Sequence, residues 1–162
     1  MVTLVIPGTL VYVTKSAHVG WGLSLPFSLV PSILGGCLIG AGLILLGWTN
    51  QLFARVGQGT LAPWDATQRL VARGVYRHVR NPMISGVLSI LLGEAALLGA
   101  LPLLYWFGLF LLVNLLYIPL VEERDLEGRF GEDYRLYKQS VPRWIPRLRP
   151  WTAQFGAALH EE

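Results

Sequence analysis

Two adjacent carboxylates, Glu122 and Glu123, directly follow the last long apolar stretch of the sequence. If that stretch is a helix, its carboxyl end already carries partial negative charge, so acidic residues there oppose the helix dipole. A cationic group must therefore offset them. The arginines of the preceding polar loop and a positively charged ligand are both open as that group. A carboxylate in this place can also act as a proton acceptor.

A second segment with chemical potential runs from Leu70 to Gly86 and leads from a basic loop into an apolar stretch. Pro82 suits the first turn of a helix there, because it has no backbone N–H to leave unpaired. Within that helix, Glu94 is an ionisable group among apolar residues, which is costly in lipid unless a partner or a cavity receives it. Asn114 is its predicted hydrogen-bond partner.

Metal and disulfide chemistry are not expected. The three histidines, His18, His78 and His160, lie far apart without a cysteine or carboxylate cluster beside them, so no zinc site is predicted. The only cysteine, Cys37, lies in an apolar run and cannot form a disulfide framework within the chain.

The composition indicates a membrane protein. Of 162 residues, 53% are apolar and only 14% are charged, whereas soluble domains have roughly 25% charged residues. No charge occurs from residue 19 to residue 50, and only Glu94 is charged from residue 81 to residue 121. Lipid must therefore cover part of the surface.

The apolar stretches predict an all-α, polytopic bundle of about four spanning helices in one domain, residues 1–162. A spanning helix needs about 20 apolar residues, which residues 29–53 supply. Residues 82–120 are twice that length, and the sequence Gly99-Ala100-Leu101-Pro102 should divide them into spans at 82–99 and 102–121. Residues 2–14 form a short first span, which residues 10–21 extend if Lys15 snorkels. Gly36 and Gly40 should let helix backbones approach closely.

The positions of the basic residues predict the orientation. Cytoplasmic loops of membrane proteins are rich in Lys and Arg. Five arginines lie between the second and third predicted spans, and six arginines and one lysine lie in the tail, residues 122–162. We therefore expect both termini and the tail on the cytoplasmic side of a bacterial-type inner membrane.

The tail should contain a cytoplasmic amphipathic helix followed by an irregular segment. Apolar and aromatic residues recur at helical spacing, at Leu126, Phe130, Tyr134 and Tyr137. Three prolines between residues 141 and 151 prevent a regular helix there. We expect that segment to lie at the lipid headgroups, with Trp144 and Trp151 in the interface and its arginines near lipid phosphates.

An ordered set of motifs spans residues 57–146. The motifs are Gly57-Gln58-Gly59-Thr60, Leu70-Val71, Gly74-Val75-Tyr76, Arg80-Asn81-Pro82-Met83 with Gly86, Glu122-Glu123, residues 130–134, Tyr137-Lys138, Val141-Pro142 and Pro146. Together they resemble the membrane methyltransferase family that contains isoprenylcysteine carboxyl methyltransferases and phosphatidylethanolamine N-methyltransferases. Asn81 replaces a histidine of many relatives, as in the phospholipid branch. Ile118 stands where the prenylcysteine branch has an arginine, which disfavours a prenylcysteine substrate.

The resemblance implies methyl transfer from S-adenosylmethionine to a lipid or hydrophobic small molecule within the membrane, with a phospholipid amine favoured. The partners it implies are the bilayer and this acceptor, not nucleic acid. It implies catalytic roles for Glu122 and Glu123. The cofactor contacts that it implies are Gln68, Arg69, Leu70, Val71, Tyr76, Asn81, Pro82, Met83, Ile84 and Glu122.

Physical chemistry agrees with this implication, because a carboxylate can pair with a sulfonium cation and Tyr76 can add a cation–π contact. Three alternatives stay open at this point. The first is methyl transfer to a prenylcysteine-type carboxyl group or a small thiol. The second is an NADPH-dependent membrane reductase, and the third is a non-catalytic membrane adaptor in which the carboxylates only pair with arginines.

Overall fold

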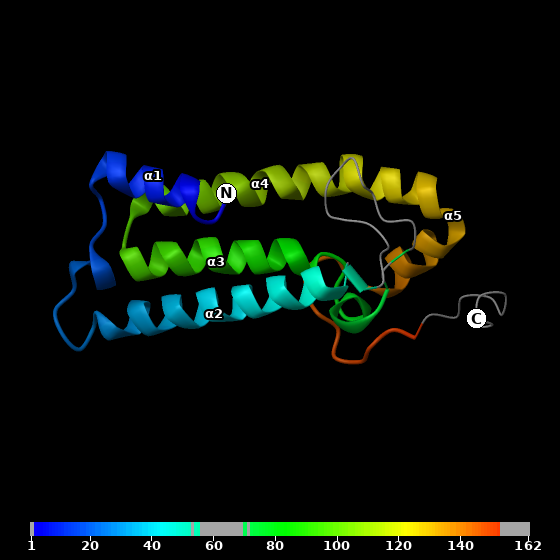
Figure 1. Cartoon of the computed structure of the whole chain (residues 1–162), viewed down its shortest axis with the longest axis horizontal. Helices are drawn as coiled ribbons and strands as arrows, with labels where there is room; N and C mark the ends of the chain where they lie inside the picture. The colour runs from blue at the N-terminus through cyan, green and yellow to red at the C-terminus, as the bar shows by residue number, and fades with distance from the viewer. Residues whose placement is uncertain (1, 53, 56–69, 71, 153–162) are drawn as a thin grey trace. The chain divides into compact units, whose positions relative to one another are not determined.

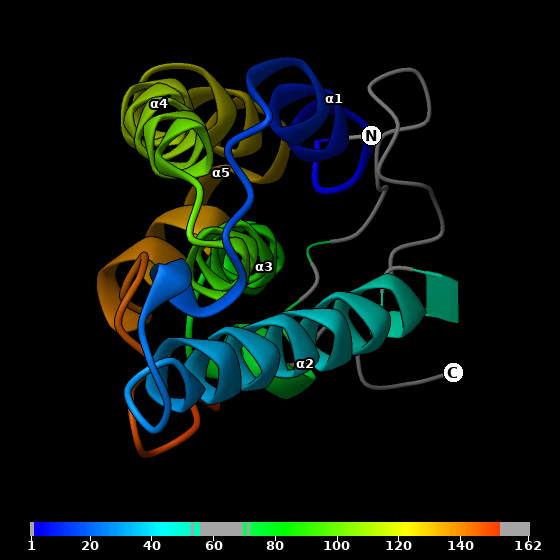
Figure 2. The same ribbon diagram turned by 90° about the vertical axis from the view of Figure 1, so that its left-hand side faces the viewer.

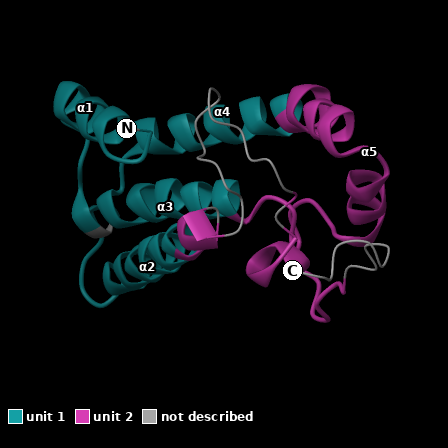
Figure 3. Cartoon of the chain, turned by 45° about the vertical axis from the view of Figure 1, so that its right-hand side comes forward, with its two compact units in different colours: residues 1–47, 83–117 teal, residues 48–82, 118–162 magenta. Residues whose placement is uncertain are grey.

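A computed structural model of the chain describes residues 2–52, 54–55, 70 and 72–152 (Figure 1). Within these residues the regular structure is helical and contains no strand. The chain forms two compact units, each built from two separate stretches (Figure 3). Unit 1 comprises Met1–Gly47 and Met83–Tyr117, and unit 2 comprises Trp48–Pro82 and Ile118–Glu162.

Four apolar helices make up most of unit 1. They are α1 (Val5–Thr14), α2 (Leu29–Leu52, which continues into unit 2), α3 (Pro82–Leu98) and α4 (Leu101–Tyr117). The predicted helical segments are therefore confirmed. Two helical stretches are long and apolar enough to cross a membrane, Leu29–Leu52 and the one that begins at Leu101. The other two are shorter apolar helices of 10 and 17 residues, so the count of four spans stays a prediction.

The predicted break between α3 and α4 is confirmed at Gly99. This residue has a φ of +59°, which suits glycine because it lacks a Cβ. A Cβ at Gly99 would also lie 2.5 Å from the carbonyl oxygen of His18. The turn therefore requires glycine for its backbone conformation and for the close approach of the segment before α2.

The predicted extension of the first helix to Trp21 is wrong. Helix α1 ends at Thr14, and Lys15 adopts a left-handed conformation with a φ of 48°. The chain then reaches a short 3₁₀ turn, η1 (Val19–Gly22), where the Trp21 indole N–H donates to the carbonyl of Ala96, 3.0 Å away. This contact with the end of α3 holds the segment in place of a continued helix.

Helices α2 and α3 lie side by side (Figure 2), and glycines bring them together, but these glycines are not the predicted ones. No heavy atom outside the helix lies within 4 Å of a Cβ built on Gly36 or Gly40. A Cβ on Gly35 would lie 2.7 Å from the Gly93 carbonyl oxygen, and one on Gly42 would lie 2.6 Å from the Gly86 carbonyl oxygen. Residues seven apart share one helix face, so the contact follows Gly35 and Gly42 instead of the four-residue spacing.

The predicted pairing of Asn114 with Glu94 is also wrong. The Asn114 side-chain amide donates to the carbonyl of Phe110 one turn earlier in α4, at 2.8 Å. Among the described residues, the buried Glu94 Oε2 has no hydrogen-bond partner. The amide forms the local bond because a carbonyl of its own helix lies within reach without any reorientation of α3.

Unit 2 contains the predicted amphipathic helix, α5 (Glu123–Ser140), after a π-helical turn, η4 (Ile118–Glu122). Tyr134 and Tyr137 are buried in a cluster with Ala72 and Val141, and Leu126 and Phe130 pack against it. The predicted stripe is thus confirmed. The stripe continues across a kink in α5 at Gly131, where φ is 54° and ψ is −126°. The prediction that the segment after Ser140 is not a regular helix is confirmed through residue 152.

Trp151 packs within unit 2, and its expected position at the membrane interface stays a prediction. Its ring centroid lies 5.4 Å from that of Tyr137, and its backbone N–H donates to the carbonyl of Arg77. Arg147 donates to the carbonyl of Ser140 at 2.6 Å, and Arg143 pairs with Glu123. Arg143 and Arg147 thus have partners within unit 2, and the expected place of the loop's arginines near lipid phosphates stays a prediction.

The kink in α5 leads to a prediction about Gly131. Replacing it with alanine should lower the free energy of unfolding by about 1–3 kcal/mol, because only glycine adopts this backbone conformation without strain. The matched change Gly128→Ala lies in the same helix, with no heavy atom near the new Cβ, and should be neutral or stabilising. Denaturant titration of the two purified variants measures the difference, and equal stabilities would contradict the assigned strain.

Candidate functional site

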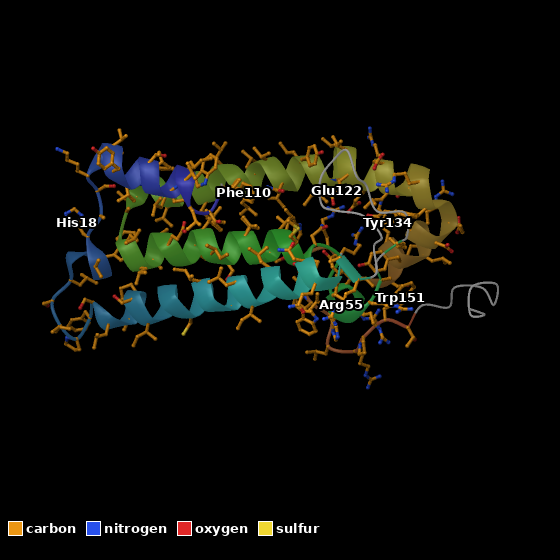
Figure 4. All side chains as sticks on the ribbon, in the orientation of Figure 1. His18, Arg55, Phe110, Glu122, Tyr134 and Trp151 are labelled. Atoms are coloured by element: carbon orange, nitrogen blue, oxygen red, sulfur yellow. The ribbon has the colours of Figure 1, made fainter. Side chains whose placement is uncertain are left out.

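The candidate site lies in unit 2, where three segments that are distant in sequence contribute charged groups. These segments are the end of the basic loop after the 3₁₀ turn η3 (Gly74–Arg77), the junction of η4 with α5, and the chain after α5. Gly74 has a φ of +55°, and a Cβ there would lie 2.9 Å from a methyl carbon of Leu52. This glycine lets η3 approach the end of α2. Figure 4 marks Glu122, Tyr134 and Trp151 in this unit.

Glu123 is a buried carboxylate that forms ion pairs with three cationic side chains. It is only 2% exposed. Its oxygens lie 2.9 Å from Arg80 Nη1, 2.7 Å from Arg143 Nε, and 3.3 Å from Lys138 Nζ. Arg143 binds in a bidentate manner, because its Nη2 also donates to Oε2 at 3.0 Å. Burial alone raises the pKa of Glu123, but the Arg143 hydrogen bond and the charges of Arg80 and Arg143 outweigh burial and lower that pKa below 4.5.

Glu122 is in the opposite situation. It is half-buried, and it has no ion-pair partner in the part of the chain that the structure describes. Burial, followed by the neighbouring charge of Glu123, raises the pKa of Glu122 above 4.5. Consecutive side chains on an α-helix point about 100° apart, so cations gathered around Glu123 need not reach Glu122. Of the two explanations left open by the sequence, pairing with arginine is seen for Glu123 and, among the described residues, not for Glu122.

Three buried tyrosines, Tyr76, Tyr134 and Tyr137, lie near the carboxylates. The Tyr137 hydroxyl donates to the backbone carbonyl of Tyr76 at 2.7 Å, which joins α5 to η3. Burial and the nearby charge of Glu122 raise the pKa of Tyr76. Burial and the charge of Glu123 raise the pKa of Tyr134 to about 12. These phenols are therefore protonated near neutral pH and do not act as bases.

Backbone hydrogen bonds fix the loop that carries Arg80. The Arg80 N–H donates to the carbonyl of Pro142, and the Arg147 N–H donates to the carbonyl of His78, each at 2.9 Å. The carbonyl of Trp151 accepts a 2.5 Å bond from Arg77 Nε. The segment after α5 thus runs beside residues 77–80 and holds Arg80 toward Glu123. Among the described residues, the buried Arg80 Nε has no acceptor.

The structure brings several of the predicted site residues into unit 2. Leu70 packs against the buried cluster, and Tyr76 is buried within the unit. Asn81 and Pro82 follow Arg80 directly, while Met83 and Ile84 continue into the first turn of α3, in unit 1. Gln68, Arg69 and Val71 lie outside the described residues, as do the predicted glycines of residues 57–59.

Two charged residues of the site were not predicted from the sequence. Lys138 and Arg143 lie 15 and 20 positions after Glu123 (138 − 123 and 143 − 123), and both bind it. No local spacing rule connects residues so far apart when a kink intervenes. The one available signal was the high density of basic residues in a tail that follows two carboxylates.

These features define a class of protein: a membrane-associated chain whose described regular structure is helical and which contains a half-buried carboxylate. The comparison with known families specifies it further. The phospholipid methyltransferase family matches residues 30–133, which is more than half of the chain. The chain belongs to this family, as its motifs predicted, and is therefore a member of a methyltransferase family that acts on lipids. No curated protein sequence and no solved structure matches it significantly.

The family match includes Arg80, Glu122 and Glu123 but ends at residue 133. The two cations that complete the Glu123 cluster, Lys138 and Arg143, lie beyond it. The matched region thus contains both carboxylates and one of the three cations around Glu123.

Proposed function

We propose that the protein transfers a methyl group from S-adenosylmethionine to the headgroup amine of a phospholipid, with Glu122 as the central charged residue. The observation that carries this proposal is the contrast between the two carboxylates. Glu123 is neutralised by three cations, whereas Glu122 is half-buried and has no ion-pair partner among the described residues. Family membership supplies the methyltransferase class.

The groups of unit 2 fit an amino-acid sulfonium. Glu122 offers a carboxylate for a positive charge, and partial burial strengthens such a pairing. Arg80 Nε offers a buried donor without an acceptor among the described residues, which suits the carboxylate of an amino-acid group. We propose that the residues that complete the cofactor site are Gln68, Arg69, Leu70, Val71, Tyr76, Asn81, Pro82, Met83 and Ile84.

The chemistry of the site can be divided between the cofactor and the chain. S-adenosylmethionine supplies an electrophilic methyl group when it is bound. An ethanolamine headgroup is an ammonium near neutral pH and must lose a proton before its nitrogen can attack. Glu122, whose pKa is raised by burial, is a stronger base than an exposed glutamate and accepts that proton. Holding acceptor and donor in line is worth about 7–11 kcal/mol in well-oriented reactions.

Glu123 has a positioning role in this proposal. Its oxygens are already engaged by Arg80, Lys138 and Arg143, so they are poor partners for a further cation. Its ion pairs hold the loop before Asn81 and the segment after α5 in place. We therefore assign the catalytic role foreseen for the carboxylate pair to Glu122, with Glu123 acting through the arrangement it maintains.

A phospholipid amine is the favoured acceptor. Ile118, which stands where the resembling prenylcysteine enzymes have an arginine, is 1% exposed and offers no charge for a substrate carboxylate. We further propose that the four apolar helices all span a bacterial-type inner membrane, with both termini and the carboxylate pair at the cytoplasmic face, where the basic residues concentrate. In that arrangement a lipid reaches the site from the bilayer and the cofactor from the cytoplasm.

The variant Glu122→Gln tests the proposed site. Its dissociation constant for S-adenosylmethionine should rise about 10- to 100-fold, because a charged hydrogen bond contributes about 1.5–3 kcal/mol. Equilibrium dialysis with radiolabelled cofactor measures it on detergent-purified protein. Wild-type affinity should also fall with decreasing pH as Glu122 protonates, and the fall should begin at a higher pH than the ordinary glutamate value of 4.5 because burial raises this pKa.

The matched control is Glu132→Gln, which removes the same charge from an exposed position on α5. Its cofactor affinity should stay at the wild-type value. An equal affinity of Glu122→Gln and wild type would remove Glu122 from the site. Wild-type protein that binds NADPH but not S-adenosylmethionine would point instead to a reductase. Methylation of phosphatidylethanolamine vesicles by the wild type, measured by mass spectrometry, tests the acceptor separately.

A further inference from the structure

The tail loop, residues 142–151, presents apolar side chains to the outside of unit 2. Leu148 is 97% exposed and Ile145 is 81% exposed. The tryptophans do not share this exposure: Trp151 packs on Tyr137, and the Trp144 indole nitrogen is buried. Large aliphatic side chains exposed together on one short loop of a polar unit are typical of a surface that contacts a partner or a membrane.

This exposure belongs to a loop that is tied to the rest of the unit. Its backbone exchanges hydrogen bonds with residues 77–80 at Pro142, Arg147 and Trp151. The carbonyl of Arg147 also lies 2.7 Å from His78 Nδ1. Ile145 and Leu148 therefore lie between fixed points, and the loop cannot fold them inward without breaking these bonds.

The charge of the tail loop indicates which kind of partner it binds. It contains three arginines and no acidic residue. Arg143 and Arg147 have contacts within unit 2, but Arg149 is exposed beside Leu148. Exposed aliphatic side chains beside an arginine suit a membrane leaflet, which has hydrocarbon beneath its anionic headgroups. A second copy of the chain that packed loop against loop would bring the two Arg149 side chains together, which like-charge repulsion disfavours.

We propose that the tail loop docks on an anionic lipid surface, with Ile145 and Leu148 inserted below the headgroups and Arg149 among the phosphates. Transfer of the two side chains from water to lipid supplies the hydrophobic part of the interaction. Arg149 supplies an electrostatic part that depends on anionic lipid. This inference concerns membrane contact alone and is independent of the methyltransferase assignment.

A fluorescent probe on the loop tests the proposal. In a Cys37→Ser background, Leu148→Cys is labelled with an environment-sensitive dye and the full chain is placed in nanodiscs, one chain per disc. In discs that contain phosphatidylglycerol, the emission should move to shorter wavelength and spin-labelled lipid should quench it. Adding Arg149→Gln should lower the ratio of inserted to water-exposed probe about fivefold, which corresponds to about 1 kcal/mol for one basic residue.

The matched control places the same dye at Glu132→Cys, an exposed charged position on α5. That probe should keep its aqueous spectrum and escape quenching. Equal quenching at positions 148 and 132 would overturn the proposal. Shielding of position 148 that appears only in discs with two chains, without lipid quenching, would also overturn it and would identify a second copy as the occupant. If the inserted fraction of the probe is the same in discs of neutral lipid alone as in discs that contain phosphatidylglycerol, Arg149 has no role in docking.

Discussion

Replacing both Gly35 and Gly42 with alanine should force α2 away from α3, whereas the same change at Gly36 and Gly40 should leave the pair packed. The new Cβ atoms of the first variant would meet backbone atoms at 2.7 and 2.6 Å. Backbone cannot move aside as a flexible side chain can. The new Cβ atoms of the second variant would have no heavy atom outside their helix within 4 Å.

The two double variants should differ in unfolding free energy by about 2–6 kcal/mol, twice the cost of about 1–3 kcal/mol for one overpacked site. Each variant gains the same helix propensity from two alanines, so that contribution cancels in the comparison. Titration of both purified proteins with sodium dodecyl sulfate, followed by circular dichroism, measures the difference. Equal midpoints would contradict the assignment of Gly35 and Gly42 to the helix contact.

The second large effect is expected at Glu123. Replacing it with glutamine should lower the free energy of unfolding by about 3–5 kcal/mol, because removing one partner of a buried ion pair leaves the other charge uncompensated. The Arg80 side chain is only 10% exposed and would become that charge. The wild-type contribution should be fully present above the ordinary pKa of 4.5 and lost as pH falls through the lowered folded-state pKa.

The control for Glu123 is Glu127→Gln, which removes a carboxylate that also binds Lys138 but is 30% exposed. Exposed ion pairs contribute about 0–1 kcal/mol, so this variant should unfold near the wild-type midpoint. A similar small loss for Glu123→Gln would show that water or a rearranged side chain compensates Arg80. Cofactor binding measured at a temperature where both variants remain folded separates the stability effect from any effect on Glu122.

The sequence was sufficient for the elements because lipid imposes strong rules on them. Long uncharged stretches must be helices, since no water satisfies their backbone groups, and the helices were found where these stretches lie. The break at Gly99 and the start of α3 at Pro82 followed from local backbone chemistry. The stripe that ends at Tyr137 followed from helical periodicity.

The sequence was insufficient wherever rotation about a helix axis decides a contact. Helix α2 has five glycines, and its apolar composition does not tell which of them face α3. Gly36 and Gly40 had the familiar spacing, but Gly35 and Gly42 make the contact. For Asn114 the sequence offers acceptors on its own helix and across the hairpin, and the structure shows the local one, the carbonyl of Phe110.

The candidate site shows the same limit in its electrostatics. Adjacent glutamates are equivalent in the sequence, and the resemblance assigned both to catalysis. The surroundings of the two carboxylates differ because Lys138 and Arg143, which lie beyond the family match, form ion pairs with Glu123. Ion pairs between residues far apart in sequence produce no periodic pattern. The different surroundings of the two carboxylates are therefore seen only in the three-dimensional structure.

The backbone bonds between the tail loop and residues 77–80 have a consequence for biosynthesis. Arg80 and His78 find their partners on Pro142 and Arg147, more than 60 residues later in the chain. Unit 2 therefore cannot complete its folding until residues 142–147 have been synthesised, and a chain cut short before residue 142 would have the carboxylate pair without the hydrogen bonds that hold the loop around it.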